Sequence, residues 1–221
     1  MVIRHITLKD DFFRLIETFT TAFVGTIAEL HIVSHSIGAG LFPGYHVPSI
    51  DEYRRNKLLK VIVAKRRITY EEVLDTEIGA ILADDFLKPT VRGKAAKFRQ
   101  AFAPAATIKL WGCNSGVANW RYSDNGETDP NVHDEQIPFY WRALNLRNTP
   151  KPAVAQAFAD FFQRRTFGAT SGAHVEVLHQ GHWVKSAQYR SEVHKWPSPR
   201  LVHRLHPDRG QYRTYEPGLL P

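Results

Sequence analysis

The chain has 221 residues, of which 43% are hydrophobic and 23% charged, with a formal net charge of +7 and a single cysteine. This composition is ordinary for a globular protein and argues against wholesale disorder. One cysteine excludes an intramolecular disulfide framework and a cysteine-rich zinc site, and no run approaches the roughly 18 apolar residues of a membrane span. Charged residues interrupt the N-terminal segment where a signal peptide carries its apolar core. We therefore expect a cytoplasmic protein, or one delivered into a target cell without a cleavable signal peptide.

The first part of the chain predicts a strand, a helix and a second strand. Residues 2–8 have strand character, and an aspartate at position 10 or 11 is suited to cap a helix that runs to about Val24. Apolar side chains recur along that helix at spacings of three and four, as in an amphipathic helix: Phe12, Leu15, Ile16, Phe19 and Phe23. Residues 29–33 then predict a short buried strand, which ends at a glycine-rich loop over residues 34–40.

The middle of the chain predicts mostly helix from residue 51 to residue 103. Pro89 marks a break in this region, and a last short helix over residues 94–102 ends at Pro104. A second core strand is predicted at residues 107–111, and it ends in the sequence Gly-Cys-Asn-Ser-Gly.

The last part of the chain predicts a surface loop at 124–130, a helix at 153–165 and a third core strand at 172–178. Further on the chain becomes basic and proline-rich. We therefore expect an α/β domain over 1–185 and a C-terminal extension over 186–221. Strands that alternate with helices favour a mostly parallel sheet flanked by helices, with the functional site at the carboxyl ends of the strands.

Two of the predicted strands end in glycine-flanked polar loops, one with His35 and the other with the only cysteine, Cys113. A cysteine nucleophile needs a base, because a free thiol is mostly protonated at neutral pH. A histidine at the end of the neighbouring strand supplies that base and later returns the proton to the leaving amine. The 78 residues between the two (113 − 35) suit strands that are bridged by a helical crossover. We expect acyl-transfer chemistry that needs no cofactor and no metal.

The two motifs resemble those of a known family. Ile-Val-Ser-His-Ser at 32–36 with Gly-Leu-Phe at 40–42, and Ile-Lys-Leu-Trp-Gly-Cys-Asn at 108–114, resemble the catalytic-strand motifs of the caspase-like cysteine peptidases of clan CD. The similarity is greatest to bacterial members of the CHAT and adhesin-associated type. It covers about residues 1–180, and only these short motifs are specific.

The resemblance implies a caspase-like fold, with Cys113 as nucleophile, His35 as base, and main-chain N–H groups around the oxyanion. Ser36, Gly112 and Asn114 are the candidate oxyanion and substrate-binding residues. Ser36 departs from the family, in which glycine usually follows the histidine. The implied partner is a protein or peptide substrate, and the implied protein a bacterial effector or toxin. No pocket motif carries over. Asp84 and Asp85 either select a basic substrate residue or form a solvated helix end, and we favour the second.

Four other interpretations remain open at this stage. Residues 34–38 resemble the nucleophile elbow of serine hydrolases, with Ser36 as nucleophile. The net charge, with aromatic residues among basic ones, suits a nucleic-acid-binding or nuclease module. A caspase-like fold without turnover would serve as an interaction domain. Two His-x-x-His pairs are weaker zinc candidates, because glycine and proline there argue against a helix: His179 with His182 and His203 with His206.

Overall fold

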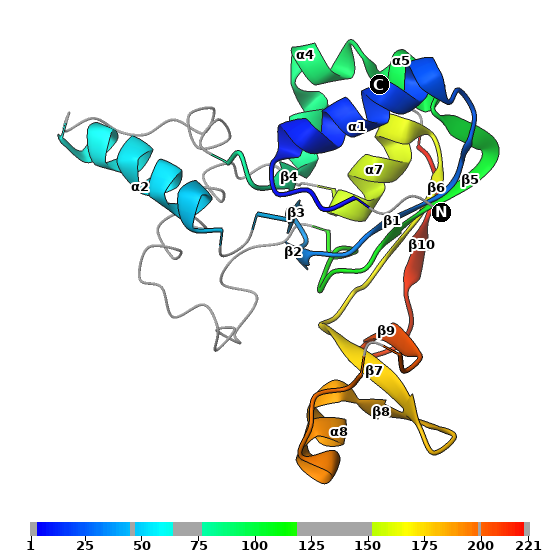
Figure 1. The fold of residues 1–221 in the computed structure, drawn as a ribbon. Helices are drawn as coiled ribbons and strands as arrows, with labels where there is room; N and C mark the ends of the chain where they lie inside the picture. The colour runs from blue at the N-terminus through cyan, green and yellow to red at the C-terminus, as the bar shows by residue number, and fades with distance from the viewer. Residues whose placement is uncertain (1–3, 45–46, 64–76, 119–151, 199, 219–221) are drawn as a thin grey trace.

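The computed structural model describes residues 4–44, 47–63, 77–118, 152–198 and 200–218 (Figure 1). The helices and strands follow one another along the chain in this order: α1 (Lys9–Ala22), β1 (Ile27–Ile32), β2 (His35–Ile37), β3 (Gly40–Phe42), α2 (Pro48–Val63), β4 (Ile81–Leu82), the 3-10 helix η1 (Ala83–Leu87), α4 (Pro89–Arg92), α5 (Ala95–Arg99), β5 (Phe102–Leu110), α7 (Val154–Phe162), β6 (Arg165–Gly168), β7 (Ala173–His179), β8 (His182–Lys185), α8 (Ser186–Val193), β9 (His203–Pro207) and β10 (Arg213–Tyr215).

The largest sheet, sheet A, has the strand order β1-β5-β6-β10. β1, β5 and β6 run parallel, and β10 adds an antiparallel edge next to β6. Helices α1, α5 and α7 lie together on one side of this sheet (Figure 1). The predicted α/β class with a mostly parallel sheet is confirmed, and the strands expected at 29–33 and 107–111 are β1 and β5.

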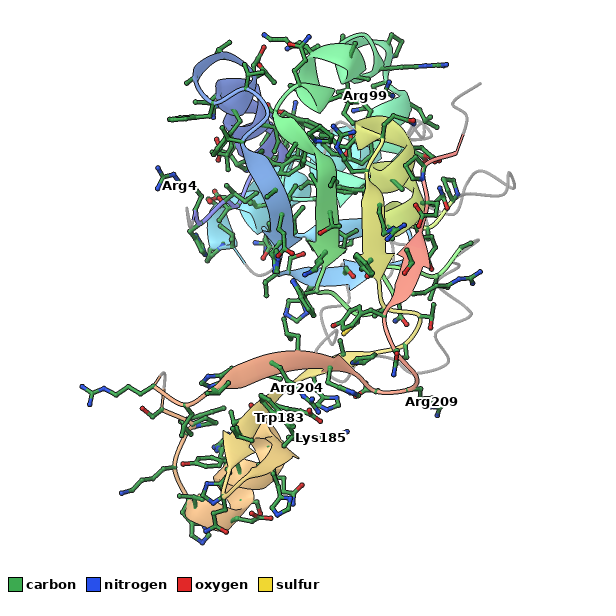
Figure 2. All side chains as sticks on the ribbon, turned by 90° about the vertical axis from the view of Figure 1, so that its right-hand side faces the viewer. Arg4, Arg99, Trp183, Lys185, Arg204 and Arg209 are labelled. Atoms are coloured by element: carbon green, nitrogen blue, oxygen red, sulfur yellow. The ribbon has the colours of Figure 1, made fainter. Side chains whose placement is uncertain are left out.

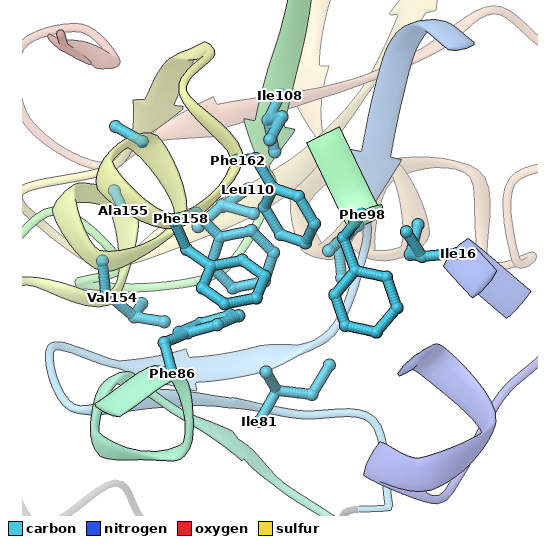
Figure 3. Close-up of a cluster of buried hydrophobic side chains, with 14 of the residues drawn as sticks. Ile16, Ile81, Phe86, Phe98, Ile108, Leu110, Val154, Ala155, Phe158 and Phe162 are labelled. Carbon is cyan, nitrogen blue, oxygen red and sulfur yellow. The ribbon is translucent and has the colours of Figure 1, made fainter. Parts of the chain in front are cut away.

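The hydrophobic core lies between sheet A and these helices, and phenylalanine rings dominate it (Figure 3). The amphipathic pattern of α1 directs Phe12 and Ile16 inward, where both are at most 2% exposed. α7 is apolar on nearly every side and almost wholly buried. Its Phe158 ring meets Phe86 of η1 edge-on with 4.9 Å between centroids. Burial of one such ring stabilises the fold by roughly 1.5–3 kcal/mol.

The predicted glycine-rich loop at 34–40 folds as a hairpin instead. β2 and β3 pair antiparallel around a tight turn, and β4 extends this sheet B on the far side of β3. Gly40 explains part of this arrangement, because a Cβ at that position would lie 2.9 Å from the Ile81 carbonyl oxygen. Only glycine allows β3 and β4 to approach so closely.

The region predicted as mostly helical holds the long helix α2 and three short helical segments, but also strand β4. The predicted helix over 94–102 ends at Arg99, and β5 begins at Phe102, before Pro104. Pro104 falls where the β1–β5 register shifts, between the pairs Ile27–Phe102 and Glu29–Thr107. A β-bulge is one of the few places where proline fits a strand, because the ladder there needs no N–H donor.

Residues 173–207 form a separate unit, which we call the sheet C module. It consists of the antiparallel sheet β8-β7-β9 and helix α8, and it lies beyond the end of sheet A, between β6 and β10 in the chain (Figure 1). The strand predicted at 172–178 is present as β7, but its prediction as a strand of the core sheet is wrong. β7 belongs to the module, and β6 is the third parallel strand of sheet A. The residues expected as an extension contain α8, β9 and β10. The domain boundary at 185/186 stays a prediction.

Residues 4–8 lead into α1 without joining a sheet in the described part of the chain, so the predicted strand at 2–8 is wrong there. The helices expected from residue 10 and at 153–165 correspond to α1 and α7. The predicted loop at 124–130 lies outside the described residues. None of the helices within the described ranges is both long enough and apolar enough to cross a bilayer.

Candidate active site at the carboxyl ends of β1 and β5

β1 and β5 are adjacent parallel strands, so the residues that follow them meet at the same edge of sheet A. Ile32 pairs with Leu110 at the end of the ladder, and the Trp111 N–H donates to the Ile32 carbonyl oxygen at 2.8 Å. His35 and Cys113 each come three residues after these last paired positions. The structure therefore brings together the two loops that the sequence singles out.

A side-chain hydrogen bond joins the two loops. Ser36 is buried, and its Oγ donates to the Cys113 carbonyl oxygen at 2.5 Å. Gly112 makes this approach possible, since a Cβ there would lie 2.3 Å from the Ser36 Oγ. A side chain of any size at position 112 would push the loops apart.

Ser115, which is fully buried, holds the Cys113 loop in place. The Ser115 Oγ donates to the Gly112 carbonyl oxygen at 3.1 Å and accepts from the Ala169 N–H at 3.0 Å. The hydroxyl of Tyr215, on β10, donates to the carbonyl oxygen of Gly116. Such contacts fix a loop before any ligand arrives.

The N-terminus of α7 contacts both loops. The Val154 N–H donates to the Gly38 carbonyl oxygen at 2.8 Å, and the Ala155 N–H donates to the Ser115 carbonyl oxygen at 3.0 Å. These bonds satisfy two of the N–H groups that the first turn of a helix leaves without intrahelical partners. α7 is therefore a shared support for the turn after β2 and for the turn after Cys113.

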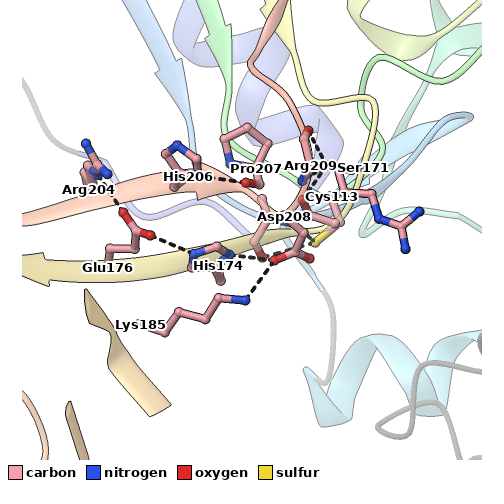
Figure 4. A network of polar contacts seen from close by, with 12 residues as sticks. Cys113, Ser171, His174, Glu176, Lys185, Arg204, His206, Pro207, Asp208 and Arg209 are labelled. Atoms are coloured by element: carbon pink, nitrogen blue, oxygen red, sulfur yellow. Dashed lines mark hydrogen bonds and ion pairs between the residues drawn. The ribbon is translucent and has the colours of Figure 1, made fainter. Parts of the chain in front are cut away.

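The Cys113 thiol is partly buried where the sheet C module joins the rest of the chain (Figure 4). The Ala173 N–H donates to the sulfur at 3.2 Å, and the Ala173 carbonyl oxygen lies 3.5 Å from it. Nothing in the local sequence pattern around residue 173 signals this contact, because it joins residues 60 apart in the chain.

Tyr212 adds a second polar group beside Cys113 that sequence reasoning did not assign to the site. Its ring meets Trp111 edge-on with 5.0 Å between centroids. Its hydroxyl is buried and has no hydrogen-bond partner among the described residues. Burial, and then the nearby charge of Cys113, raise the pKa of Tyr212 to about 12. The hydroxyl therefore stays protonated and remains a donor at neutral pH.

His35 is exposed at the start of β2. Within the described chain, the hydrogen-bond contacts of the Cys113 thiol are both to Ala173, so the loops meet without a hydrogen bond between the His35 ring and the sulfur. Among the candidate oxyanion donors, the Asn114 N–H is already donated to the Ser171 carbonyl oxygen at 2.8 Å. Asn114 has a φ of 56°, a left-handed conformation that turns the chain directly after Cys113.

Two alternatives from the sequence lose support here. A nucleophile elbow at Ser36 would lead into a helix, whereas β2 leads into the hairpin and the Ser36 Oγ donates to the Cys113 carbonyl oxygen.

Asp85 is 1% exposed rather than solvated. Its carboxylate pairs with Lys9 at 2.8 Å and accepts from the Leu82 N–H at 2.9 Å. Asp85 thus ties α1 to η1, so its prediction as a solvated helix end is wrong.

The basic residues in the described ranges are spread over both ends of the molecule. Arg99 lies at one end of the molecule, and Lys185 and Arg204 lie at the other, in the sheet C module (Figure 2). Two exposed tryptophans of this module carry arginines over their rings, Arg204 on Trp183 at 4.2 Å and Arg190 on Trp196 at 4.3 Å. These rings are already covered on one face, which weakens their use as stacking platforms for bases.

Comparisons of the chain with protein-family models, with curated proteins and with solved structures find no match.

Proposed function

We propose that this chain is a cysteine peptidase of the caspase-like type, with Cys113 as the nucleophile and His35 as the base. The observation that supports it best is the parallel pairing of β1 and β5, which puts the His35 and Cys113 loops at one sheet edge, joined by the Ser36 hydrogen bond. The substrate would be a protein or peptide. An effector or toxin role, in the cytoplasm or in a target cell, is part of the same proposal.

The chemistry needs no other reactant than water. His35 removes the thiol proton of Cys113, and the sulfur attacks the scissile carbonyl carbon. Collapse of the tetrahedral intermediate breaks the C–N bond, and His35 gives its proton to the departing amine. His35 then removes a proton from water, and the resulting hydroxide attacks the thioester. The C–S bond breaks, the acid is released, and His35 returns the proton to the sulfur.

His35 must approach the thiol for this step. His35 is exposed at the first residue of β2, outside the hydrophobic core, so a change of its rotamer does not require the core to repack. Catalytic hydrogen bonds are often long or misaligned before substrate binds, and they tighten in the complex. We propose that a bound substrate turns His35 toward Cys113.

Two donors are suited to the oxyanion. The Cys113 backbone N–H has no acceptor within the described residues, and its loop is fixed by Ser36 and Ser115. The Tyr212 hydroxyl is a buried donor beside the same residue. Pre-oriented donors of this kind contribute to catalysis because they need no reorganisation when charge develops. The Asn114 N–H is a poorer candidate than the resemblance implies, because Ser171 already accepts it.

Thiol reactivity tests the proposal directly. Iodoacetamide labelling of Cys113 would be followed by mass spectrometry across pH in the wild type, His35→Ala and His182→Ala. His182 is the control, since it is an exposed histidine on β8, in another sheet. We expect fast labelling near neutral pH, a loss of about tenfold or more in His35→Ala, and wild-type behaviour in His182→Ala.

A second pair of probes distinguishes the cysteine peptidase from a serine hydrolase that uses Ser36. A fluorophosphonate reacts with an activated serine, and a peptidyl acyloxymethyl ketone reacts with a peptidase cysteine. Labelling of Cys113 by the ketone supports the peptidase. Labelling of Ser36 by the fluorophosphonate, or slow alkylation of Cys113 that ignores His35, contradicts it.

A further inference from the structure

The sheet C module holds a cluster of metal-ligating side chains that contains none of the proposed peptidase residues. His174, Glu176 and His206 each offer one ligand atom, and these atoms lie within 4.8 Å of one another (Figure 4). The cluster follows from strand pairing. His174 and Glu176 are two residues apart on β7 and share a face, and His206 is the cross-strand partner of His174 on β9.

Both imidazoles are already oriented as metal ligands. The Nδ1 of His174 is 2.5 Å from an Asp208 carboxylate oxygen, and the Nδ1 of His206 is 2.7 Å from the Pro207 carbonyl oxygen. An Nδ1 beside such an acceptor carries the proton, which leaves the Nε2 lone pair for a metal. Carboxylate–histidine and carbonyl–histidine pairs of this kind accompany most metal-bound histidines.

The Nε2 of His174 faces Glu176 at 3.0 Å. Asp208 therefore faces one ring nitrogen of His174, and Glu176 faces the other. A metal ion between the Nε2 and the Glu176 carboxylate would be bound by both. Ligand atoms of a tetrahedral zinc ion lie about 3.3 Å apart, so the three side chains need only small rotamer changes to close on one ion.

The module also lacks a core of its own. It spans residues 173–207 and contains six of the eleven histidines of the chain. Among its described residues, only Val177 and Pro207 are buried, and α8 buries none. Units of this size rarely bury enough apolar surface to be stable, and a bound metal is one of the usual remedies.

We propose that His174, Glu176 and His206 bind a divalent ion of the zinc class and that this ion stabilises the sheet C module. Two imidazoles and one carboxylate suit Zn²⁺ and do not suit Ca²⁺ or Mg²⁺, which prefer oxygen ligands alone. Three protein ligands leave a fourth position for water or another ligand.

Two cationic side chains bind the carboxylates at the cluster. Arg204 donates to the second carboxylate oxygen of Glu176 at 2.7 Å, and Lys185 lies 3.7 Å from Asp208. Arg204 therefore holds Glu176 in position through the oxygen that faces away from His174. Asp208 acts through His174 and is a positioning residue for the metal.

Zinc binding by the full chain tests the proposal. Protein freed of metal with a chelator would be titrated with ZnCl2 in competition with a chromophoric chelator, at about pH 7.5, where histidine is mostly neutral. We expect one equivalent to bind, with affinity reduced at least about 100-fold in His174→Gln and His206→Gln. Asp208→Asn, which keeps all three ligands, should lose about 10–100-fold. Cys113→Ser should bind zinc as the wild type does.

His203→Gln is the matched control, because His203 is on the same strand as His206 but pairs its Nδ1 with the Leu201 carbonyl oxygen. Hydrogen exchange would be measured with and without zinc, and peptides of the module should exchange more slowly with zinc while those of α1 and α7 do not change. Circular dichroism confirms that each variant is folded. Zinc affinity that is unchanged in both ligand variants, or equally reduced in His203→Gln, would overturn the site. Module exchange that ignores zinc would overturn its stabilising role.

Discussion

The Ser36 hydroxyl donates to the Cys113 carbonyl oxygen at 2.5 Å, across 77 residues of sequence. This bond explains why serine suits position 36 of this chain, whereas glycine usually follows the histidine in caspase-like peptidases. Glycine at position 36 would leave the carbonyl of Cys113 without this donor. The compensating glycine is Gly112, whose missing Cβ makes room for the serine side chain.

Replacement of Ser36 by alanine should therefore affect both stability and the thiol. A partly buried carbonyl that loses its donor costs about 1–2 kcal/mol, and a loop that shifts by a fraction of an ångström slows a positioned nucleophile. We expect Ser36→Ala to lower the free energy of unfolding by that amount and the rate of Cys113 alkylation roughly tenfold. Urea unfolding and iodoacetamide labelling measure the two effects.

The matched control for this variant is Ser34→Ala. The Ser34 Oγ bonds only to the carbonyl oxygen of its neighbour His35 among the described residues, at 2.9 Å. We expect a change within about 0.5 kcal/mol and unaltered labelling. Equal effects of the two variants would mean that the Ser36–Cys113 bond does not position the loop.

Gly112→Ala should separate the same loops by steric means. The new Cβ would lie 2.3 Å from the Ser36 Oγ and 2.9 Å from the Ser34 carbonyl oxygen, so backbone must move. We expect a loss of roughly 1–3 kcal/mol, together with slower labelling of Cys113. Gly181→Ala is the comparison, because it strains a φ of +82° but meets nothing within 4 Å. It should cost about 1 kcal/mol and leave Cys113 reactivity unchanged.

The local parts of the fold follow from the sequence. α1 and α7 show apolar side chains at helical spacing, and β1 and β5 are short apolar segments that end in glycine-rich turns. The parallel class follows from the alternation of strands and helices, which also placed His35 and Cys113 at one edge of the sheet. The helices and strands themselves are set by neighbours in the chain, and the rules for connecting strands then restrict how they pair.

The parts that the sequence did not predict depend on contacts between distant residues. β7 resembles a core strand in composition, but its cross-strand partners on β8 and β9 take it into a separate sheet. The sequence suggests His203 and His206 as a zinc pair at a spacing of three, yet residues at odd spacing face opposite sides of a strand. The real neighbour of His206, His174, lies 32 residues earlier. Tyr212 likewise reaches Cys113 only through β10 and its connection.

Asp85 should be among the most sensitive positions outside the site. Its carboxylate is 2% exposed, and it pairs with a Lys9 side chain that is 11% exposed. Lys88 also lies 3.4 Å from this carboxylate. Loss of one charge from a buried ion pair of this kind costs about 3–5 kcal/mol. We expect Asp85→Asn to lower the free energy of unfolding by about 3 kcal/mol, measured by urea unfolding. Glu17→Gln breaks a solvent-exposed pair with Lys97 and should leave the unfolding midpoint almost unchanged.

Tyr212 should make stability fall at high pH. Burial, and secondarily the charge of Cys113, raise its pKa in the folded protein to about 12, whereas an unfolded tyrosine titrates near about 10. Below that lower value both states hold the proton, and the contribution is constant. Between the two values the unfolded chain releases a proton that the folded chain keeps, so the unfolded state binds fewer protons and stability decreases as pH rises. The loss approaches roughly 2 kcal/mol at the upper end.

Tyr212→Phe isolates this effect from the general weakening of a protein in alkali. The variant removes a buried hydroxyl that has no partner among the described residues, so we expect it to be as stable as the wild type or up to about 1 kcal/mol more stable at pH 7. Its advantage should grow from pH 10 to pH 12, measured by urea unfolding at each pH. Tyr189→Phe, whose ring packs edge-on against His179, should show no such growth. If the Tyr212 hydroxyl also serves the oxyanion, the more stable variant will be the slower enzyme, and a variant that gains stability without losing peptidase activity would remove Tyr212 from the proposed mechanism.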